Sequence, residues 1–371
     1  MTTVRLVSTA ADRRVFTDYP YKKYRDDPSW VPPLRISEAE RLDFKKNPFF
    51  EHARVELYLA ERGGTTVGRI AVIDDDLHNA THQDNLLFFG FFEAEDEEAA
   101  RQLYAQLEKR AQDLGRVRVR GPVNPTMNDS AGFQINAFDT LPYLMMPQNP
   151  PEYPRWAKEA GFEKAKDLYA WRLRETDGLG ERVSRLADRV RKRNTFELRP
   201  LNMRDFDAEV ERVLTFYNRY WEDNWGHVKY TGTEARKLAA DIKPIVDPNM
   251  ILFMEMGGEL AGMVVGLPDI NQVFKRIPSG RLFPFGFWPL LRRRKHIDRI
   301  RLFILGLAPQ FRNRGLELVM IDEFYKRGVA RGYNEAECSW ILEDNDAINK
   351  GIKATGAELY KTYRLYQKDF I

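Results

Sequence analysis

The same order of predicted strands and helices occurs twice along the chain, and this repeat restricts the fold more than any other feature. Each half begins with a strand and two helices, continues with a hairpin and another strand, and then alternates helices with strands. In the first half we predict elements at residues 4–8, 11–25, 37–46, 55–61, 66–73, 86–92, 97–114 and 117–120, with a last hairpin around 164–173. In the second half we predict them at residues 196–200, 205–223, 233–243, 250–256, 260–266, 301–308, 315–331, 335–341, 346–355 and 359–368. The pattern predicts an α/β fold of mixed α+β type, made of two similar domains, each a twisted mixed β-sheet flanked by helices.

Turn and cap residues support these boundaries. Gly63-Gly64 and Gly257-Gly258 each separate two β-rich runs, and such pairs are typical of tight hairpin turns. Gly115 directly follows a helical pattern, where a left-handed residue commonly ends a helix. Ser37 is the expected N-cap of the second helix.

The length of 371 residues suits about two domains. We expect the first domain at residues 1–175 and the second at 196–371, joined at 176–195 by a basic helix whose arginines lie between 181 and 193. A charged linker helix is usually a solvated spacer. This helix would also suit nucleic acid, although a net charge of +3 does not favour nucleic-acid binding by the chain as a whole.

Composition indicates a cytoplasmic protein that does not cross a membrane. The chain is 43% hydrophobic and 30% charged, and no apolar run approaches the roughly 20 residues of a membrane span. The first ten residues lack the apolar segment of a secretory signal. Cys338 is the single cysteine, which excludes an internal disulfide and zinc sites built on several thiolates. His78 and His82 lie beside three aspartates, but a polar loop is the simpler interpretation, and we predict no metal site.

The segment from Arg301 to Arg331 has the order of an anion-binding site. An apolar strand ending at Ala308 runs into a short loop with Arg312 and Arg314, and then into a long helix. The first N–H groups of a helix lack partners within the helix and carry partial positive charge, which favours a pyrophosphate. The chain has no Walker loop, Rossmann glycine motif, nucleophile elbow or His-Glu-x-x-His motif, so the corresponding enzyme classes lack their parts.

The loop Gln310-Phe311-Arg312-Asn313-Arg314-Gly315 resembles the pyrophosphate loop of the GNAT (Gcn5-related N-acetyltransferase) superfamily, Gln/Arg-x-x-Gly-x-Gly/Ala. Asn313 stands where this pattern has its first glycine, and asparagine tolerates the left-handed conformation better than other residues with a side chain. Asn345 and Gly356 follow at the spacing of the superfamily's later motif. The chain therefore resembles a tandem arrangement of two GNAT domains.

This resemblance implies that the second domain binds acetyl-CoA or another acyl-CoA. Main-chain groups of Leu305 and Leu307 would hold the pantetheine arm like an added strand, and Asn345 would contact the cofactor arm. Main-chain amides would surround the pyrophosphate at Phe311, Arg312, Asn313, Arg314, Gly315 and Leu316. Glu317 departs from this picture, because a carboxylate that pointed inward would repel a phosphate.

The resemblance also indicates where catalytic groups should lie. In many GNAT relatives a tyrosine in the late helix protonates the departing thiolate, but Ile352 stands at that position. Tyr363 in the last strand is the candidate replacement, although most strand tyrosines only pack. Glu343 follows the strand where the sheet would open and is the candidate base, with a solvated loop acid as the alternative. Glu337 is a weaker candidate.

The first domain is expected to lack the cofactor site. Its corresponding junction of strand and helix has five carboxylates between Glu93 and Glu98, without an arginine or a glycine loop. Like charges at this range oppose a bound pyrophosphate.

Two further segments have unusual composition. Residues 121–151 form a long stretch rich in Asn, Pro and Met, which we expect to be an ordered loop over the other domain's acceptor site, or structural filler. The insertion at 269–299 places Phe283 to Trp288 beside the basic run Arg292 to His296. The apolar residues and the basic run together would suit an acidic or acyl-bearing acceptor, a membrane surface or RNA. The alternative is a packed flap with a solvated charged rim.

The leading hypothesis is an N-acyltransferase, with acetyl transfer as the first expectation, that moves an acyl group from CoA to an amine of a small molecule or peptide. Two alternatives remain open. Tandem GNAT domains also occur in Fem-like transferases that use aminoacyl-tRNA and in N-myristoyltransferases, and the basic helix would suit tRNA. A non-catalytic CoA-binding or scaffolding protein would be consistent with Asn313, Glu317 and Ile352.

Overall fold

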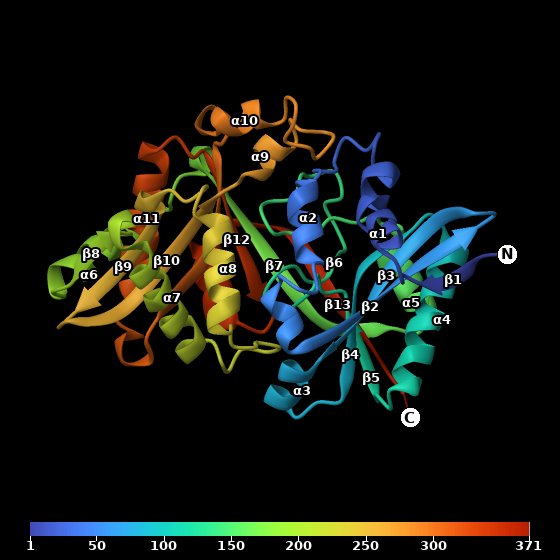
Figure 1. Cartoon of the computed structure of the whole chain (residues 1–371). Coiled ribbons are helices and arrows are strands. Elements are labelled where there is room, and N and C mark those ends of the chain that lie inside the picture. Colours follow the sequence, from blue (N-terminus) through green and yellow to red (C-terminus); the bar gives the residue numbers. More distant parts are fainter. Residues whose placement is uncertain (371) are drawn as a thin grey trace.

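Strands from both halves of the chain form one continuous sheet in the computed structural model, which describes residues 1–370 (Figure 1). The first half contributes β1 (Thr3–Leu6), β2 (Ala53–Arg62), β3 (Thr65–Asp75), β4 (Leu86–Ala94), β5 (Arg118–Gly121), β6 (Phe133–Gln134) and β7 (Glu163–Arg174). The second half contributes β8 (Glu197–Pro200), β9 (Ile251–Met256), β10 (Glu259–Pro268), β11 (Arg299–Leu307), β12 (Glu335–Leu342) and β13 (Glu358–Asp369). The pairs β4–β5 and β11–β12 are parallel and their neighbours are antiparallel, so the predicted fold class with mixed sheets is confirmed.

Helices cover this sheet on both sides. The first half holds α1 (Ala10–Lys23), α2 (Arg35–Arg41), α3 (Asp76–His82), α4 (Glu97–Asp113) and α5 (Glu152–Glu159). The second half holds α6 (Glu181–Arg193), α7 (Phe206–Tyr220), α8 (Gly232–Ile242), α9 (Asn271–Phe274), α10 (Phe287–Leu291), α11 (Leu316–Ala330) and α12 (Asp346–Ala354). The first half lies on the right of Figure 1 and most of the second half on the left.

Alternation along the strands divides the core into two layers. In β3, Val72 packs in one cluster with Leu103 of α4, whereas the next residue, Ile73, packs in another with Phe16 of α1. Successive strand residues point to opposite faces, so an uninterrupted apolar strand requires cover on both faces. The second half repeats this arrangement, with Phe253 of β9 on one face and Met254 on the other.

The last strands of the two halves are exchanged. The strand order is β1-β2-β3-β4-β5-β13-β7-β12-β11-β10-β9-β8, and β6 pairs with β13. The C-terminal β13 thus lies beside β5 of the first half, and β7 of the first half lies beside β12 of the second. The hairpin expected around residues 164–173 is wrong, because β7 is one strand whose two neighbours both come from the second half. The domain boundaries at 175 and 196 stay a prediction.

The helix predicted between the halves is α6, and it packs against α11 instead of forming a solvated spacer. Val183 and Ala187 are buried, and Arg191 donates to the Asp322 carboxylate of α11 at 2.6 Å. The basic helix is therefore anchored against the helix that follows the candidate pyrophosphate loop.

The predicted hairpin turns and the end of α4 are confirmed, since both glycine pairs and Gly115 have positive φ angles. The second helix differs from its prediction, because α2 begins at Arg35 rather than after Ser37. The Arg35 amide donates to the Gly280 carbonyl at 2.9 Å. The insertion therefore supplies the acceptor that a capping side chain would otherwise provide. Among the described residues, no helix is long and apolar enough to span a membrane.

Candidate active site

The parallel strands β11 and β12 separate in the middle of the second half. Their pairing runs from Arg299↔Glu335 to Leu302↔Cys338 and then stops. On its other edge β11 stays paired with β10 as far as Leu307, with a register shift at Val265/Gly266 that leaves Phe303 unpaired. Beyond Leu302, the edge of β11 that faces away from β10 has no strand beside it in the described part of the chain. Leu305 and Leu307 lie in this stretch of β11. An added strand could pair with this open edge.

A cavity of about 640 Å³ occupies the opening between the two strands. It lies between β11, β12, α11 and α12, and most of its lining is apolar, including Leu305, Ile321, Phe324, Ile348 and Ile352. Its apolar lining suits a chain of methylene groups better than a charged ligand.

Gly306 has a steric role in this cavity. A Cβ atom at this position would lie 2.2 Å from the ring of Trp221, which also lines the cavity. A glycine in β11 therefore allows the indole at the end of α7 to lie against the strand.

The loop after β11 has the conformation that the sequence suggested. Asn313 has φ +61° and so occupies the left-handed region, as expected for the residue in place of glycine. Gly315, at φ +74°, precedes the first turn of α11, and a Cβ there would lie 3.0 Å from Val190 of α6. The Arg312 side chain donates to the Leu307 carbonyl at 3.1 Å, and the Arg314 guanidinium lies 5.7 Å from the centre of the Phe311 ring. Strand end, loop and helix start thus form one unit.

The loop and the first turn of α11 carry both positive and negative side chains. Arg312, Asn313 and Glu317 all line the cavity. The Glu317 carboxylate in the first turn of α11 therefore offsets part of the positive charge of the loop.

Asn345 also lies at the cavity, where it begins α12. Its side-chain oxygen accepts a hydrogen bond from the Ile348 amide at 3.3 Å, so this oxygen caps the helix. Ile352, the residue in place of the usual tyrosine, is buried in α12 and lines the same cavity. The structure therefore brings Leu305, Leu307, Arg312, Asn313 and Asn345 to one site, which is consistent with their predicted roles without testing them.

Neither of the two predicted catalytic residues lines this cavity. Glu343 is outside its lining, pairs with Lys164 at 2.5 Å and accepts from the Asp167 amide at 3.0 Å. Tyr363 is fully buried on β13, and its phenol oxygen has no hydrogen-bond partner among the described residues. Burial and the nearby Glu337 carboxylate raise the pKa of Tyr363 well above its usual value. Their catalytic roles stay predictions.

A buried polar cluster lies where β11 and β12 part, and we call Arg301, Glu337, Ser339 and Tyr360 the Glu337 cluster. Glu337 accepts hydrogen bonds from the Tyr360 phenol and, at 2.6 Å, from the Ser339 hydroxyl. Arg301, opposite Glu337 in the register, donates to the Ser339 hydroxyl at 2.9 Å. Ser339 also lines the cavity, so the cluster adjoins the opening at this residue.

The sequence pattern indicated Glu337 of this cluster as a weaker candidate base but did not single out Arg301, Ser339 or the bond with Tyr360. Arg301 and Glu337 are charged residues in the interiors of β11 and β12, and both are almost completely buried. Charged side chains are rarely buried unless they are paired or functional. Cys338 lies between Glu337 and Ser339 on the same strand. Burial and the Glu337 charge raise the pKa of its thiol to about 12, which disfavours the reactive thiolate form.

The long segment at residues 121–151 is ordered and docks on the second half. The Leu144 carbonyl accepts from Arg301 at 2.8 Å, and the Leu144 amide donates to Asp269 at 2.9 Å. Asn271 donates to the Pro142 carbonyl at 3.0 Å. The segment thus packs against the Glu337 cluster through Leu144, on the side away from the cavity.

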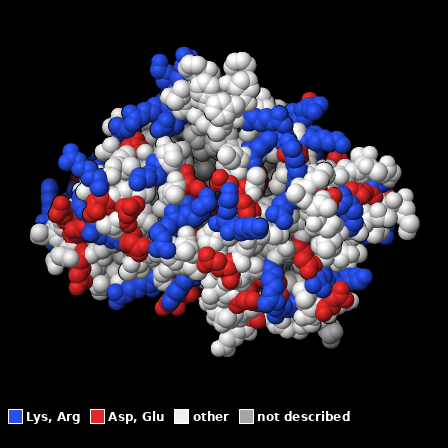
Figure 2. All heavy atoms as spheres, in the orientation of Figure 1, with Lys and Arg blue, Asp and Glu red and all other residues white. Residues whose placement is uncertain are grey.

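A second cavity, of about 500 Å³, opens beside Leu144 on the face drawn in Figure 2, where the surface is hollowed between α2, α8 and α9. Both halves line it, with Trp30 and Met146 from the first and Tyr230 and Phe274 from the second. The Glu337 cluster therefore lies between two openings, since Arg301 bonds to Leu144 at the second cavity and Ser339 lines the first.

Comparison with known proteins gives full-length relatives. The chain is 35% identical over 370 residues to "Bacterial ceramide synthase" of Caulobacter vibrioides, covering 98% of this chain and 96% of that protein. It is 33% identical over 373 residues to "Protein YghO" of Escherichia coli K12, covering 98% of this chain and 95% of that protein. The chain belongs to the family of these two proteins. No protein-family profile matches it.

The fold of this ceramide synthase and YghO family also has a solved counterpart. A tandem GNAT protein from the clavulanic acid biosynthesis pathway superposes over 100% of this chain and 98% of its own, with a TM-score of 0.57 at 12% identity. The tandem GNAT resemblance is therefore confirmed at the level of the fold.

In this family member the opening between β4 and β5 of the first half is filled by the chain itself. The Val123 amide donates to the Phe89 carbonyl at 2.8 Å, and the Phe91 amide donates to Asn124 at 2.6 Å. A Cβ at Gly90 would lie 1.6 Å from the Val123 carbonyl oxygen, so the backbones touch. The strand edge that would receive a pantetheine arm is already paired, which adds a second obstacle to the acidic start of α4.

The histidines of α3 differ from their predicted setting. Residues 76–82 form a helix rather than a polar loop, and His78 is buried against Phe88. Burial lowers the pKa of His78 to about 3, with a smaller contribution from His82. The described residues contain no group of three or more His, Cys, Asp or Glu side chains that could hold a metal.

Proposed function

We propose that this protein is an acyl-CoA-dependent N-acyltransferase that joins a fatty acyl chain to the primary amine of a long-chain amino alcohol, forming a ceramide-type amide. The full-length relationship to a bacterial ceramide synthase carries the proposal. The apolar cavity supports it, because a lining such as Leu305, Ile321, Phe324 and Ile352 favours a long hydrocarbon chain over an acetyl group. The expectation of acetyl transfer is thereby replaced by transfer of a longer acyl group.

The second half fits CoA at three places. The unpaired edge of β11 can accept main-chain hydrogen bonds from a pantetheine arm. The left-handed residues Asn313 and Gly315 turn the chain into α11, so that the first amides of that helix face an anion. Arg312 and Arg314 supply positive charge at the same loop. When bound, acyl-CoA supplies the activated thioester carbonyl.

The Glu337 cluster is positioned to take up the proton of the reaction. The amine nitrogen forms the new bond to the acyl carbon, the carbon–sulfur bond breaks, and the amine loses a proton while the thiolate gains one. Ser339 lines the cavity and its hydroxyl donates to Glu337, so we propose that the amine proton passes through this hydroxyl to that carboxylate. Tyr363, kept neutral by its raised pKa, stays the candidate donor to the thiolate, and Glu343 the alternative base.

The second cavity is the proposed entrance for the amine. It opens on the opposite side of the Glu337 cluster from α11 and α12, and apolar residues such as Trp30, Met146 and Phe274 line it. Two substrates with long chains would thus approach the cluster from different sides.

Free-thiol release measures the reaction. Purified protein is incubated with acetyl-CoA or palmitoyl-CoA and with sphinganine, spermidine or a lysine peptide as amines. We expect thiol release above the amine-free rate for palmitoyl-CoA with sphinganine, and much slower release for acetyl-CoA or the polar amines. Release that is fastest with acetyl-CoA and a polar amine would contradict the proposal. Acyl-CoA binding without turnover for any amine would favour the non-catalytic alternative.

A further inference from the structure

The insertion between β10 and β11 exposes an unusual set of large apolar side chains. Phe283, Phe285, Trp288 and Leu291 are 77%, 75%, 51% and 66% exposed, and apart from the first methionine no large apolar residue among those described is more exposed than Phe283. They lie within nine residues of one another, on and before α10, and the surface at the top of Figure 2, where Figure 1 places α10, is largely uncharged. We call these four residues the apolar tip. Soluble proteins seldom expose such clusters unless they contact another phase or partner.

Hydrogen bonds hold the base of the insertion against the first half. Besides the bond of the Arg35 amide to Gly280, the Arg35 side chain donates to the Ser279 carbonyl at 2.8 Å. Lys275 donates to the Trp30 carbonyl at 2.7 Å. Within the insertion, the Phe287 amide donates to the Leu282 carbonyl at 2.9 Å. The tip is therefore presented by a fixed base.

Cations without carboxylate partners surround the apolar tip. Arg292, Arg294 and Lys295 are exposed, and none of them forms an ion pair within the described residues. Arg293 is instead used internally, donating to the Pro244 carbonyl at 3.0 Å. These three charges are therefore available to an external anion.

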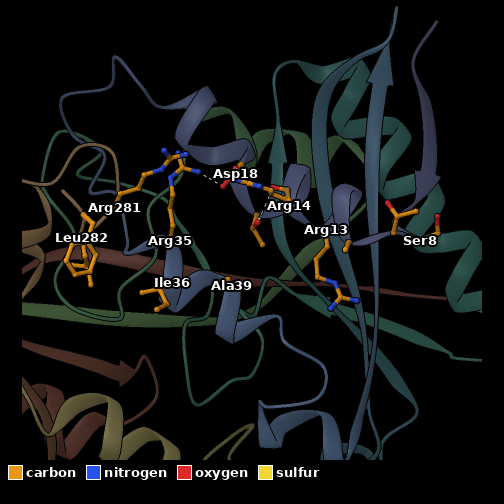
Figure 3. A pocket seen from close by; sticks show the side chains of 14 residues that line it. Ser8, Arg13, Arg14, Asp18, Arg35, Ile36, Ala39, Arg281 and Leu282 are labelled. Carbon is orange, nitrogen blue, oxygen red and sulfur yellow. Dashed lines mark hydrogen bonds and ion pairs between the residues drawn. The ribbon is translucent and has the colours of Figure 1, made fainter. Parts of the chain in front are cut away.

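A basic pocket continues this surface toward α1 and α2. Arg14, Arg35 and Arg281 line it together with the apolar Ile36 and Leu282 (Figure 3). Asp18 pairs with Arg35, leaving a net positive charge along the pocket. Phe283 of the apolar tip lines the same pocket, so the tip and the pocket are adjacent.

We propose that the apolar tip and the cations beside it dock the protein on the surface of a lipid bilayer that contains anionic headgroups. Aromatic and aliphatic side chains enter the boundary between headgroups and acyl chains, while Arg and Lys remain at the level of the phosphates. Charge complementarity favours an anionic bilayer, because the exposed residues Arg292, Arg294 and Lys295 beside the tip are all positive. A second copy of this chain would bring like charges together, which opposes self-association through this surface.

This surface does not depend on the proposed reaction, but it bears on how a lipid amine could arrive. Phe274 and Asn271 at the base of the insertion line the second cavity. A docked molecule would therefore hold that opening close to the bilayer.

Co-sedimentation with vesicles tests the proposal on the full chain. We expect binding to vesicles of phosphatidylglycerol and phosphatidylcholine, little binding to phosphatidylcholine alone, and weaker binding at about 0.5 M salt, where charges are screened over a few ångströms. The triple variant Phe283→Ser/Phe285→Ser/Trp288→Ser and the double variant Arg292→Glu/Lys295→Glu should each lower the vesicle affinity at least tenfold. All five side chains are exposed, so the fold should remain.

Matched variants remote from the insertion provide controls. Leu114→Ser/Val117→Ser removes exposed apolar residues after α4, and Lys109→Glu/Lys158→Glu makes the same change in net charge as the double variant. Both should bind like the unmodified protein. Equal binding to neutral and anionic vesicles, or unchanged binding by the tip variants, overturns the proposal. A dimer in light scattering that the tip variant dissociates, with vesicle binding unchanged, would assign the surface to a second copy instead.

Discussion

Glu337 is fully buried, and the hydrogen bonds that its carboxylate accepts come from two hydroxyls, those of Tyr360 and Ser339. A carboxylate held in this way is oriented, and Ser339, whose hydroxyl donates to it, lines the cavity. Glu343 is tied instead to Lys164 at the end of β12. The two acids therefore differ in what they can reach, although both lie on or beside the same strand.

Glu337→Gln tests this difference, with Glu343→Gln as the matched control. We expect Glu337→Gln to lower kcat at least about 100-fold, a usual loss for a general base, while palmitoyl-CoA still raises the melting temperature. Glu343→Gln should keep most of the activity. A large loss in Glu343→Gln together with an active Glu337→Gln would assign the base to Glu343.

At the scale of single residues, the sequence predicted correctly where a backbone conformation restricts which residue type can occupy a position. Asn313 was expected to take a left-handed conformation from its place in the loop, and it does so. The Glu337 cluster could not be assembled from the sequence, because Tyr360 lies on β13, which reaches β12 only through the exchanged strand β7. Contacts between residues far apart in the sequence cannot be predicted from local patterns.

At the scale of elements, the unit of β11, loop and α11 is local in sequence, and it was predictable for that reason. The shift of α2 was not predictable, because the acceptor for the Arg35 amide comes from Gly280, which is remote in sequence. Similarly, β7 and β13 have similar strand patterns, and either could complete either half-sheet. Non-local pairing decides between them.

The loop unit should be required for binding the anionic part of CoA. We predict that palmitoyl-CoA raises the melting temperature of the unmodified protein and that Arg312→Glu/Arg314→Glu abolishes this rise, because two cations at the start of α11 become anions. Thermal unfolding with and without ligand measures it. Lys109→Glu/Lys158→Glu serves as the charge-matched control and should keep the rise. An undiminished rise in the loop variant would place the anion elsewhere.

At the scale of the whole molecule, a titratable bridge joins the two halves beyond the shared sheet. His52 of the first half contacts Asp75 at 3.0 Å through one ring nitrogen and Glu234 of α8 at 3.1 Å through the other. Burial alone would lower the pKa of His52, but hydrogen bonds to the two carboxylates outweigh it and raise the pKa to about 10. The protonated ring therefore stabilises the folded state.

The raised pKa gives this bridge a defined pH dependence. The stabilisation is complete below the unfolded pKa of about 6.5 and is lost as the pH rises through about 10. We predict that His52→Gln lowers the free energy of unfolding by a few kcal/mol near pH 6.5 and that the deficit shrinks toward pH 10, measured by urea denaturation. His296→Gln in the insertion should show little change across this range. A deficit that stays constant with pH would contradict the charged bridge.

The identity of the product tests the central claim most directly. Full-length protein is incubated with palmitoyl-CoA carrying a deuterated acyl chain and with sphinganine, and the lipid extract is analysed by mass spectrometry. The account predicts the N-acylated amino alcohol with all of the label, formed by the unmodified protein and nearly absent with Glu337→Gln. Labelled amide that is absent with sphinganine but present with a peptide or polyamine would contradict it.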